Sequence, residues 1–130
     1  MGDPETEVVM PRIGSDLLEL LDAAATGHLG GKELVTLSHT AATVMLVSGG
    51  YPGDFEKGKV ISGYNEVAES LLFHAGTKLE FGKLKTAGGR VMAVTCTGKT
   101  RQEALEGCYT DARKIAYEGR YFRTDIGFDL

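Results

Sequence analysis

The sequence has 130 residues, enough for one domain or for one domain and part of another. Its net charge of −4 argues against general nucleic-acid binding. No apolar run approaches the roughly 20 residues that a membrane-spanning helix needs, and the acidic N-terminus has no apolar signal core. The composition therefore predicts a cytoplasmic globular protein that contacts neither nucleic acid nor membrane.

The chain begins with a turn signal, Gly2-Asp3-Pro4-Glu5, that carries two carboxylates. An apolar stretch, Val8-Val9-Met10, follows almost at once. Natural N-termini are usually loose and polar. We therefore expect the sequence to continue from a longer protein.

A helix is predicted over residues 15–26, because leucines recur there at helical spacing. Ser15 suits the N-cap and Gly27 suits the end of the helix. We place a domain boundary near residue 30, between a tail of residues 1–30 and a domain of residues 31–130. The leucine face needs a partner, and two are open: the C-terminal domain, or a second copy of the chain in a self-associated form.

The rest of the chain predicts an α+β domain with an antiparallel sheet. Strands are expected at 33–37, 41–48, 60–61, 70–74, 91–95 and 121–128. The stretch 41–48 is apolar enough to be central. A second helix begins after Thr100 and ends before Gly119. Its predicted buried residues are Ala104, Leu105, Cys108, Ala112 and Ile115.

The segment 83–90 has the strongest chemical character in the sequence. Lys83 and Lys85 lead into Gly88-Gly89, and Arg90 opens the strand that follows, which we expect to bury one face. Paired glycines permit positive φ and close approach, and an arginine fork suits phosphate or carboxylate. Two interpretations stay open: a hairpin turn with solvated bases, or an anion site.

Other residue types give no separate site. Cys96 and Cys108 lack metal-ligand spacing and are interpreted as reduced thiols. His28, His39 and His74 are far apart in sequence and are interpreted as structural or solvated. No catalytic residue and no metal ligand is predicted.

Six motifs, in the same order along the chain, resemble the C-terminal part of the glycinamide ribonucleotide synthetase (phosphoribosylamine–glycine ligase) family. The members of this family are ATP-grasp enzymes of purine synthesis. The motifs are G-D-P-E-T-E at 2–7, P-R-I-G-S-D-L-L-E-L-L at 11–21, S-G-G-Y-P-G-D-F-E-K-G at 48–58, F-H-A-G-T at 73–77, G-G-R-V at 88–91 and Y-F-R-T-D-I-G at 121–127. They cover nearly the whole chain.

The resemblance implies a reaction and a set of site residues. The family joins glycine to 5-phosphoribosylamine and converts ATP to ADP and phosphate, with Mg²⁺ or Mn²⁺. Asp3 matches the family's signature aspartate and is expected to hold the amine of the phosphoribosylamine. Arg90, presented by Gly89, matches a position that holds the ribose 5-phosphate in related ligases, and Lys83 or Lys85 is expected to assist.

The resemblance also implies a fold and a limit. The tail of an ATP-grasp domain would precede a small antiparallel sheet or barrel-sandwich-like domain with flanking helices. The metal ligands that precede the signature, the ATP lid and the N-terminal domain have no counterpart in these residues. The chain alone is therefore expected to be inactive. The alternative is a self-contained, non-enzymatic module that binds a ligand or a protein.

Overall fold

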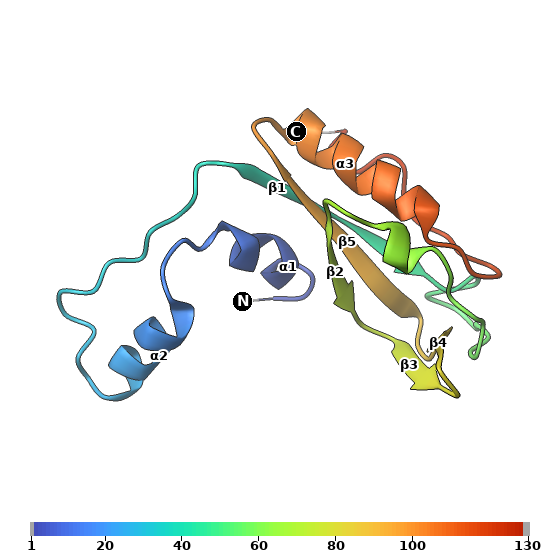
Figure 1. The fold of residues 1–130 in the computed structure, drawn as a ribbon, viewed down its shortest axis with the longest axis horizontal. Helices are drawn as coiled ribbons and strands as arrows, with labels where there is room; N and C mark the ends of the chain where they lie inside the picture. The colour runs from blue at the N-terminus through green and yellow to red at the C-terminus, as the bar shows by residue number, and fades with distance from the viewer. Residues whose placement is uncertain (1, 129–130) are drawn as a thin grey trace.

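The structure is a computed structural model and describes residues 2–128 (Figure 1). Its two antiparallel sheets and flanking helices confirm the predicted α+β class. The helices are α1 (Thr6–Val9), η1 (Met10–Arg12), α2 (Leu17–Ala25), η2 (Tyr64–Glu66) and α3 (Arg101–Lys114). The strands are β1 (Thr40–Val47), β2 (Leu71–His74), β3 (Thr77–Glu80), β4 (Lys83–Thr86) and β5 (Arg90–Gly98).

Strand β5 is the centre of the larger sheet, whose order is β1-β5-β2. Each residue from Val91 to Cys96 is buried, so this strand is covered on both faces and the expectation of one buried face was wrong. Helix α3 packs on one face of β1 and β5, and α1 contacts the same two strands. Side chains alternate along a strand, so neighbouring residues of β1 lie on opposite faces of the sheet. Thr43 faces α1, and Val44 is part of the hydrophobic core under α3.

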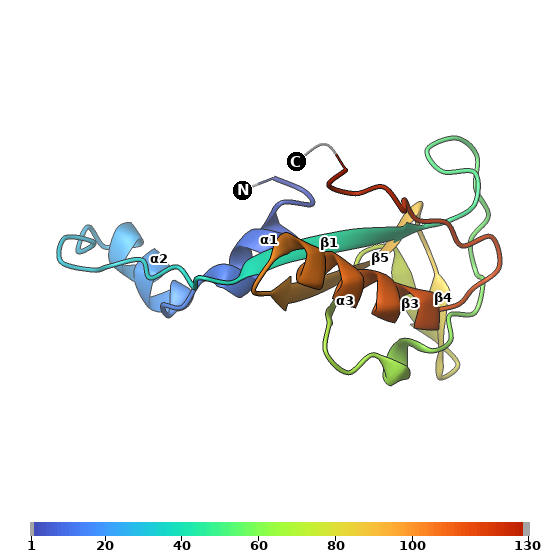
Figure 2. The same ribbon diagram turned by 90° about the horizontal axis from the view of Figure 1, so that it is seen from above.

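Helix α3 covers the sheet along its length (Figure 2). Thr100 caps it as predicted, since its hydroxyl accepts from the Glu103 amide at 3.2 Å and the Glu103 carboxylate accepts from the Lys99 amide at 2.8 Å. The predicted stripe is buried, except that Leu105 is only half-buried. This packing fixes β5 and hence the start of β5, where Arg90 lies.

The hairpin lies one strand earlier than predicted. Strands β3 and β4 pair with each other around Phe81 and Gly82, whose φ values are 50° and 72°. Gly88 and Gly89 instead connect β4 in the small sheet to β5 in the large sheet. Neither of these two glycines has a positive φ. The expectation of a Gly88-Gly89 hairpin was therefore wrong.

Close packing explains the two glycines. A Cβ on Gly88 would lie 3.1 Å from the Cα of Gly76, and one on Gly89 would lie 2.1 Å from the ring of Tyr51. The backbone here passes between neighbours that are distant in sequence. Larger residues would force the β4–β5 connection away from Tyr51.

Residues 10–39, here called the arm, extend away from the sheets in Figures 1 and 2. Asp16, not Ser15, caps α2, because the Asp16 carboxylate accepts from the Glu19 amide at 3.1 Å. The Ser15 hydroxyl instead accepts from the Val35 amide at 2.8 Å. The predicted strand at 33–37 is reduced to one bridge between Ile13 and Thr36.

Two other predicted strands are also single bridges. Val60 bridges to Lys85, and Tyr121 bridges to Val47. Beyond Tyr121 the tail finds a side-chain partner, because the Ile126 amide donates to the Tyr109 hydroxyl at 3.2 Å. Phe122 stacks on Tyr109, but Tyr121 and Phe128 remain exposed, so the alternating pattern of the tail does not produce the predicted strand.

Candidate functional site

The structure brings Asp3 and Arg90 into direct contact. Nη1 of Arg90 donates to Oδ1 of Asp3 at 2.9 Å, and Nη2 donates to Oδ2 at 2.5 Å. The two residues are 87 positions apart, and the contact is an end-on, bidentate ion pair. The hydrogen bond to Asp3 raises the pKa of Arg90, so the guanidinium is permanently charged. The pair is partly open to solvent, with 38% of the Arg90 side chain and 64% of the Asp3 side chain exposed.

The backbone under Arg90 is held from two sides. The Ser48 amide donates to the Gly89 carbonyl at 2.8 Å, and the Ser48 hydroxyl donates to the Gly88 carbonyl at 2.9 Å. The ring of Tyr51 packs where Gly89 lacks a side chain. Arg90 therefore begins β5 from a fixed connection, which suits a phosphate or carboxylate contact.

A second carboxylate, Glu7, lies beside the ion pair. Burial raises the pKa of Glu7, and the negative charge of Asp3 raises it further, while Arg90 and a hydrogen bond with Thr43 lower it. One of its oxygens is buried and has no hydrogen-bond partner. The Thr95 hydroxyl donates to the Thr43 hydroxyl at 2.9 Å. A polar cluster thus continues from the ion pair into the sheet.

Arg90 also lines a cavity of about 290 Å³ between β1, β5 and the C-terminal tail. The other lining residues are Met45, Val47, Tyr51, Tyr121, Phe122, Arg123 and Ile126. Arg123 is held by Asp125, which accepts from Nε at 2.8 Å and from Nη2 at 2.9 Å. The cavity therefore combines apolar and aromatic walls with two cationic side chains.

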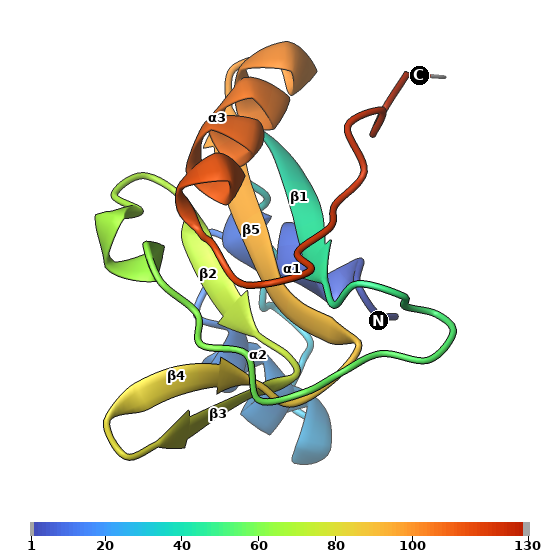
Figure 3. The same cartoon turned by 90° about the vertical axis from the view of Figure 1, so that its right-hand side faces the viewer.

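The predicted lysines are not part of this contact. Lys83 and Lys85 lie on β4, in the hairpin that all three ribbon views show apart from the N-terminus (Figure 3). Lys85 donates to the Glu80 carboxylate at 2.8 Å, and this hydrogen bond lowers the pKa of Glu80. The described contacts of Arg90 include neither lysine. The basic run in the sequence is thus divided between two sheets.

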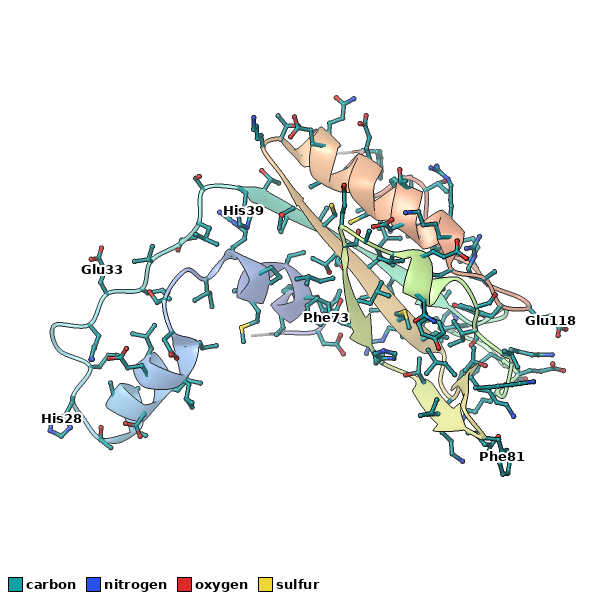
Figure 4. The ribbon with its side chains drawn as sticks, viewed as in Figure 1. His28, Glu33, His39, Phe73, Phe81 and Glu118 are labelled. Carbon is teal, nitrogen blue, oxygen red and sulfur yellow. The ribbon has the colours of Figure 1, made fainter. Side chains whose placement is uncertain are left out.

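The histidines do not converge. His28 lies at the far end of the arm and His39 near the start of β1 (Figure 4). A ring nitrogen of His39 is 3.3 Å from the Pro11 carbonyl, and one of His74 is 2.8 Å from the Thr77 hydroxyl. Within residues 2–128, no group of three or more His, Cys, Asp or Glu side chains is arranged to hold a metal ion.

The cysteines are free thiols and structural. Burial raises the pKa of the Cys108 thiol to about 12. Its Sγ lies 3.0 Å from the Ala42 carbonyl and 3.3 Å from the Val94 carbonyl, inside the core. A thiol in this state is not a nucleophile at neutral pH.

Sequence reasoning missed the aromatic and cationic walls of the cavity. Tyr51 was read only as part of a turn cluster, and Arg123 only as part of a terminal strand. The signal was the pair of aromatic residues before Arg123, but nothing local to the sequence shows that the tail returns to β1.

No helix in the described part of the chain is both long and apolar enough to cross a bilayer.

Comparison with known proteins shows which family the chain belongs to. The family described as Phosphoribosylglycinamide synthetase, C domain, matches residues 41–129. A phosphoribosylamine–glycine ligase from Rhizobium meliloti is 46% identical over 98% of this chain and 30% of its own length. The human trifunctional purine biosynthetic protein adenosine-3 is 44% identical over 98% of this chain and 13% of its own length.

A solved structure agrees with these relatives. The crystal structure of phosphoribosylamine–glycine ligase from Thermotoga maritima superposes with a TM-score of 0.78 at 40% identity, covering 96% of this chain and 31% of that one. The chain thus spans about a third or less of the length of the relatives that it matches. It belongs to the phosphoribosylglycinamide synthetase family and contains that family's C domain.

Proposed function

We propose that this chain is the C-terminal part of an ADP-forming ligase that joins glycine to 5-phosphoribosylamine in purine synthesis. Residues 1–30 would end its ATP-grasp domain, and residues 31–130 would form its C-terminal domain. The support is the match to the family and to relatives named as this ligase. The contact between Asp3 and Arg90 carries the proposal, because it joins the two segments at one accessible point.

Arg90 is proposed to hold the 5-phosphate. The two hydrogen bonds to Asp3 use one hydrogen on each terminal nitrogen. A guanidinium has five N–H groups, so Nε and a second hydrogen on each terminal nitrogen remain for an anion. The cavity beside Arg90 gives the phosphate and its ribose a place, and Gly89 contributes by admitting Tyr51 to the cavity wall.

Asp3 is proposed to hold the amine. A carboxylate has about four lone-pair directions, and Arg90 occupies only two of them. The remaining directions can accept from an amine and orient its lone pair toward an acyl phosphate. The two charges thus suit the two ends of one substrate, a phosphate and an amine.

Lys83 or Lys85 is proposed to assist Arg90 by attracting the anion. Lys85 already neutralises Glu80, while Lys83 is exposed at the start of β4. Either lysine would act through its field on an approaching anion and not through the described ion pair.

ATP and Mg²⁺ or Mn²⁺ belong to the same proposal, but the described residues do not fit the metal. No group of three or more His, Cys, Asp or Glu side chains among them is arranged to hold one, and the polar cluster beside the ion pair offers only Glu7, a half-buried carboxylate with one buried oxygen that has no partner. Nucleotide and metal would therefore be held by the part of the ligase outside this chain. The isolated chain should have no ligase or ATPase activity.

The test is a chimeric ligase in which this chain replaces the matching segment of the Rhizobium meliloti relative. We expect ADP formation that requires both glycine and 5-phosphoribosylamine, and no ADP from the isolated chain. A folded chimera without activity, or ligase activity in the isolated chain, would refute the proposal. The self-contained binding module would then be the better interpretation.

A further inference from the structure

The cavity beside Arg90 lies over three neighbouring backbone segments. Val47 of β1 pairs with Arg90 of β5 on one side and bridges to Tyr121 of the C-terminal tail on the other. The tail runs back along β1 (Figures 2 and 3), where the Val47 amide donates to the Tyr121 carbonyl at 2.9 Å and the Tyr121 amide donates to the Val47 carbonyl at 3.1 Å. Since paired strands lie about 4.8 Å apart, the backbones of Arg90 and Tyr121 are held about 10 Å apart. This spacing leaves room between the two side chains for one ribose.

A 5-phosphoribose accounts for only one end of this cavity. Its phosphate matches Arg90, but most of the other walls are aliphatic or aromatic, among them Met45, Phe122 and Ile126. Such walls offer the sugar hydroxyls no hydrogen-bond partner, and polar groups without partners are costly to bury. The volume of about 290 Å³ is close to the lower limit for ligand pockets, roughly 300 Å³. The cavity therefore suits a small ligand with an anionic end and an apolar end.

Tyr121 gives the apolar end an open aromatic ring on a fixed backbone. Its side chain is 60% exposed, and within residues 2–128 its ring has no hydrogen bond, aromatic contact or cation–π contact. The ring of Tyr51, in contrast, packs over Gly89 and meets Phe55 edge-on, with ring centroids 6.1 Å apart. An exposed aromatic ring next to a cation is the arrangement on which nucleic-acid bases stack. The flat group that suits this end is therefore a nucleobase.

We propose that the cavity binds a purine nucleoside 5′-monophosphate, with the phosphate on Arg90 and the base against Tyr121, in competition with 5-phosphoribosylamine. A purine is favoured over a pyrimidine because its two fused rings offer more surface for stacking. The competition rests on the proposed function, since both ligands would present the same ribose 5-phosphate to Arg90. This nucleotide is distinct from the ATP of the reaction, which the rest of the ligase would hold. Its binding would let purine nucleotides restrain the ligase that serves their own synthesis.

Calorimetry on the isolated chain tests the site, because all the residues that line it belong to this chain. In a buffer without phosphate, adenosine 5′-monophosphate (AMP) should bind at least tenfold more tightly than ribose 5-phosphate, which lacks the base. Uridine 5′-monophosphate should bind more weakly than AMP. Equal affinities for AMP and ribose 5-phosphate, or no binding of AMP, would overturn the proposal. Equal affinities for the two nucleotides would overturn the choice of a purine.

Substitution of Tyr121 tests the stacking. Tyr121→Leu keeps an apolar side chain and the two backbone bonds to Val47, so it should weaken AMP about tenfold and change ribose 5-phosphate little. Tyr121→Phe keeps the ring and should bind AMP as the parent does. Phe81→Leu is the matched control, because Phe81 is an exposed aromatic residue at the tip of the β3–β4 hairpin. Equal weakening of both ligands by Tyr121→Leu, in a variant with an unchanged unfolding curve, would overturn the proposal.

Substitution of Arg90 tests the anionic end. Arg90→Ala should weaken AMP and ribose 5-phosphate alike, at least tenfold each, because both would lose the same phosphate contact. Adenosine, which has no phosphate, should bind the parent and Arg90→Ala equally weakly. Full AMP affinity in Arg90→Ala would place the phosphate elsewhere and overturn the proposal.

The chimeric ligase tests the competition. At saturating ATP and glycine, AMP should raise the apparent KM for 5-phosphoribosylamine and leave kcat unchanged, and Tyr121→Leu should raise the inhibition constant of AMP about tenfold. Inhibition that is competitive with ATP alone would place AMP in the ATP site and overturn the proposal. An active chimera that AMP does not inhibit would refute this inference and leave the proposed function standing. Base-dependent AMP binding by the isolated chain with an inactive, folded chimera would uphold the site and refute the proposed function.

Discussion

Replacing Arg90 is the most direct test of the proposed site. In the chimera, Arg90→Ala removes the guanidinium that would hold the 5-phosphate. Three of its N–H groups remain after the two bonds to Asp3. A charge-assisted contact to phosphate is worth about 1.5–3 kcal/mol, so the KM for 5-phosphoribosylamine should rise roughly 10- to 100-fold. The KM values for ATP and glycine should change little.

Folding should survive this substitution. The ion pair with Asp3 is partly exposed, and exposed pairs contribute about 1 kcal/mol or less. Arg90→Lys should recover only part of the binding, because an ammonium keeps the charge but loses the planar fork. Arg101→Ala, at an exposed arginine on α3, is the matched control and should leave every KM unchanged.

The contact between the two residues adds a second expectation. Asp3→Asn should mainly lower kcat, since it disturbs the group that orients the amine. Because Asp3 and Arg90 touch, the double variant should be less impaired than the sum of the single effects, with a coupling of about 0.5–3 kcal/mol.

The assay is steady-state ADP formation with each substrate varied in turn, together with a thermal unfolding curve for every variant. A folded Arg90→Ala enzyme with an unchanged KM for 5-phosphoribosylamine would refute the assignment. Arg90 would then serve only to hold the N-terminal segment on β5. Strictly additive effects of the two substitutions would refute the coupling alone.

Three other predictions concern ionisable groups in the chain itself. Asp111→Ala should lower the free energy of unfolding by about 1.5–3 kcal/mol near neutral pH. Burial raises the pKa of Asp111, but the hydrogen bonds from Lys114 and the Ser70 amide lower it overall, so the difference between variant and parent should shrink as the pH falls below the ordinary value of 3.8. Denaturant titrations measure this difference, and a difference that is constant with pH would contradict the prediction. Glu7 has a raised pKa, so its contribution to stability is lost as the pH rises through that pKa. Glu7→Gln should therefore raise the unfolding temperature more at pH 7.5 than at pH 4, and an equal gain at both pH values would count against this prediction. Cys108, with a pKa of about 12, should resist iodoacetamide at pH 8 in the folded chain and react in urea, as mass spectrometry of the peptides can show; rapid labelling of the folded chain would be inconsistent with its burial.

Local signals in the sequence were sufficient for the elements that form the core. Strand β1 follows an uninterrupted apolar and β-branched run, and α3 follows a cap and a buried stripe. Helix α2 was predicted within two residues, but its cap was not. Ser15 and Asp16 both suit an N-cap, and only the pairing of Ser15 with Val35, twenty residues later, decides between them.

The hairpin could not be predicted from local signals, because Gly88-Gly89 is a stronger turn signal than Phe81-Gly82. The glycine pair is explained by Gly76 and Tyr51, which approach it from distant parts of the chain. Phe81 accepts a positive φ at the exposed hairpin tip, where its side chain is 96% exposed. Such tertiary contacts override turn propensity without leaving a trace in the nearby sequence.

The candidate site was reached by a different route. Chemistry alone left Arg90 as either a solvated turn residue or an anion contact, and it gave Asp3 no partner. Family resemblance indicated each residue separately, in different roles. Neither route could reveal that the two side chains meet, since they are 87 positions apart and strands of both sheets come between them in the sequence.

The contact between Asp3 and Arg90 means that the two residues cannot act independently in the proposed site. If Asp3 is to present its free lone pairs to an amine, the carboxylate must be held in one orientation, and Arg90 supplies that hold through two parallel hydrogen bonds. Arg90 in turn begins a strand that is anchored by Ser48 and covered by α3. The orientation of a carboxylate at the start of the chain therefore depends on the core of the domain that follows. For this reason an intact C domain would be needed for correct placement of the amine, even though no group of three or more His, Cys, Asp or Glu side chains among the described residues is arranged to hold a metal ion.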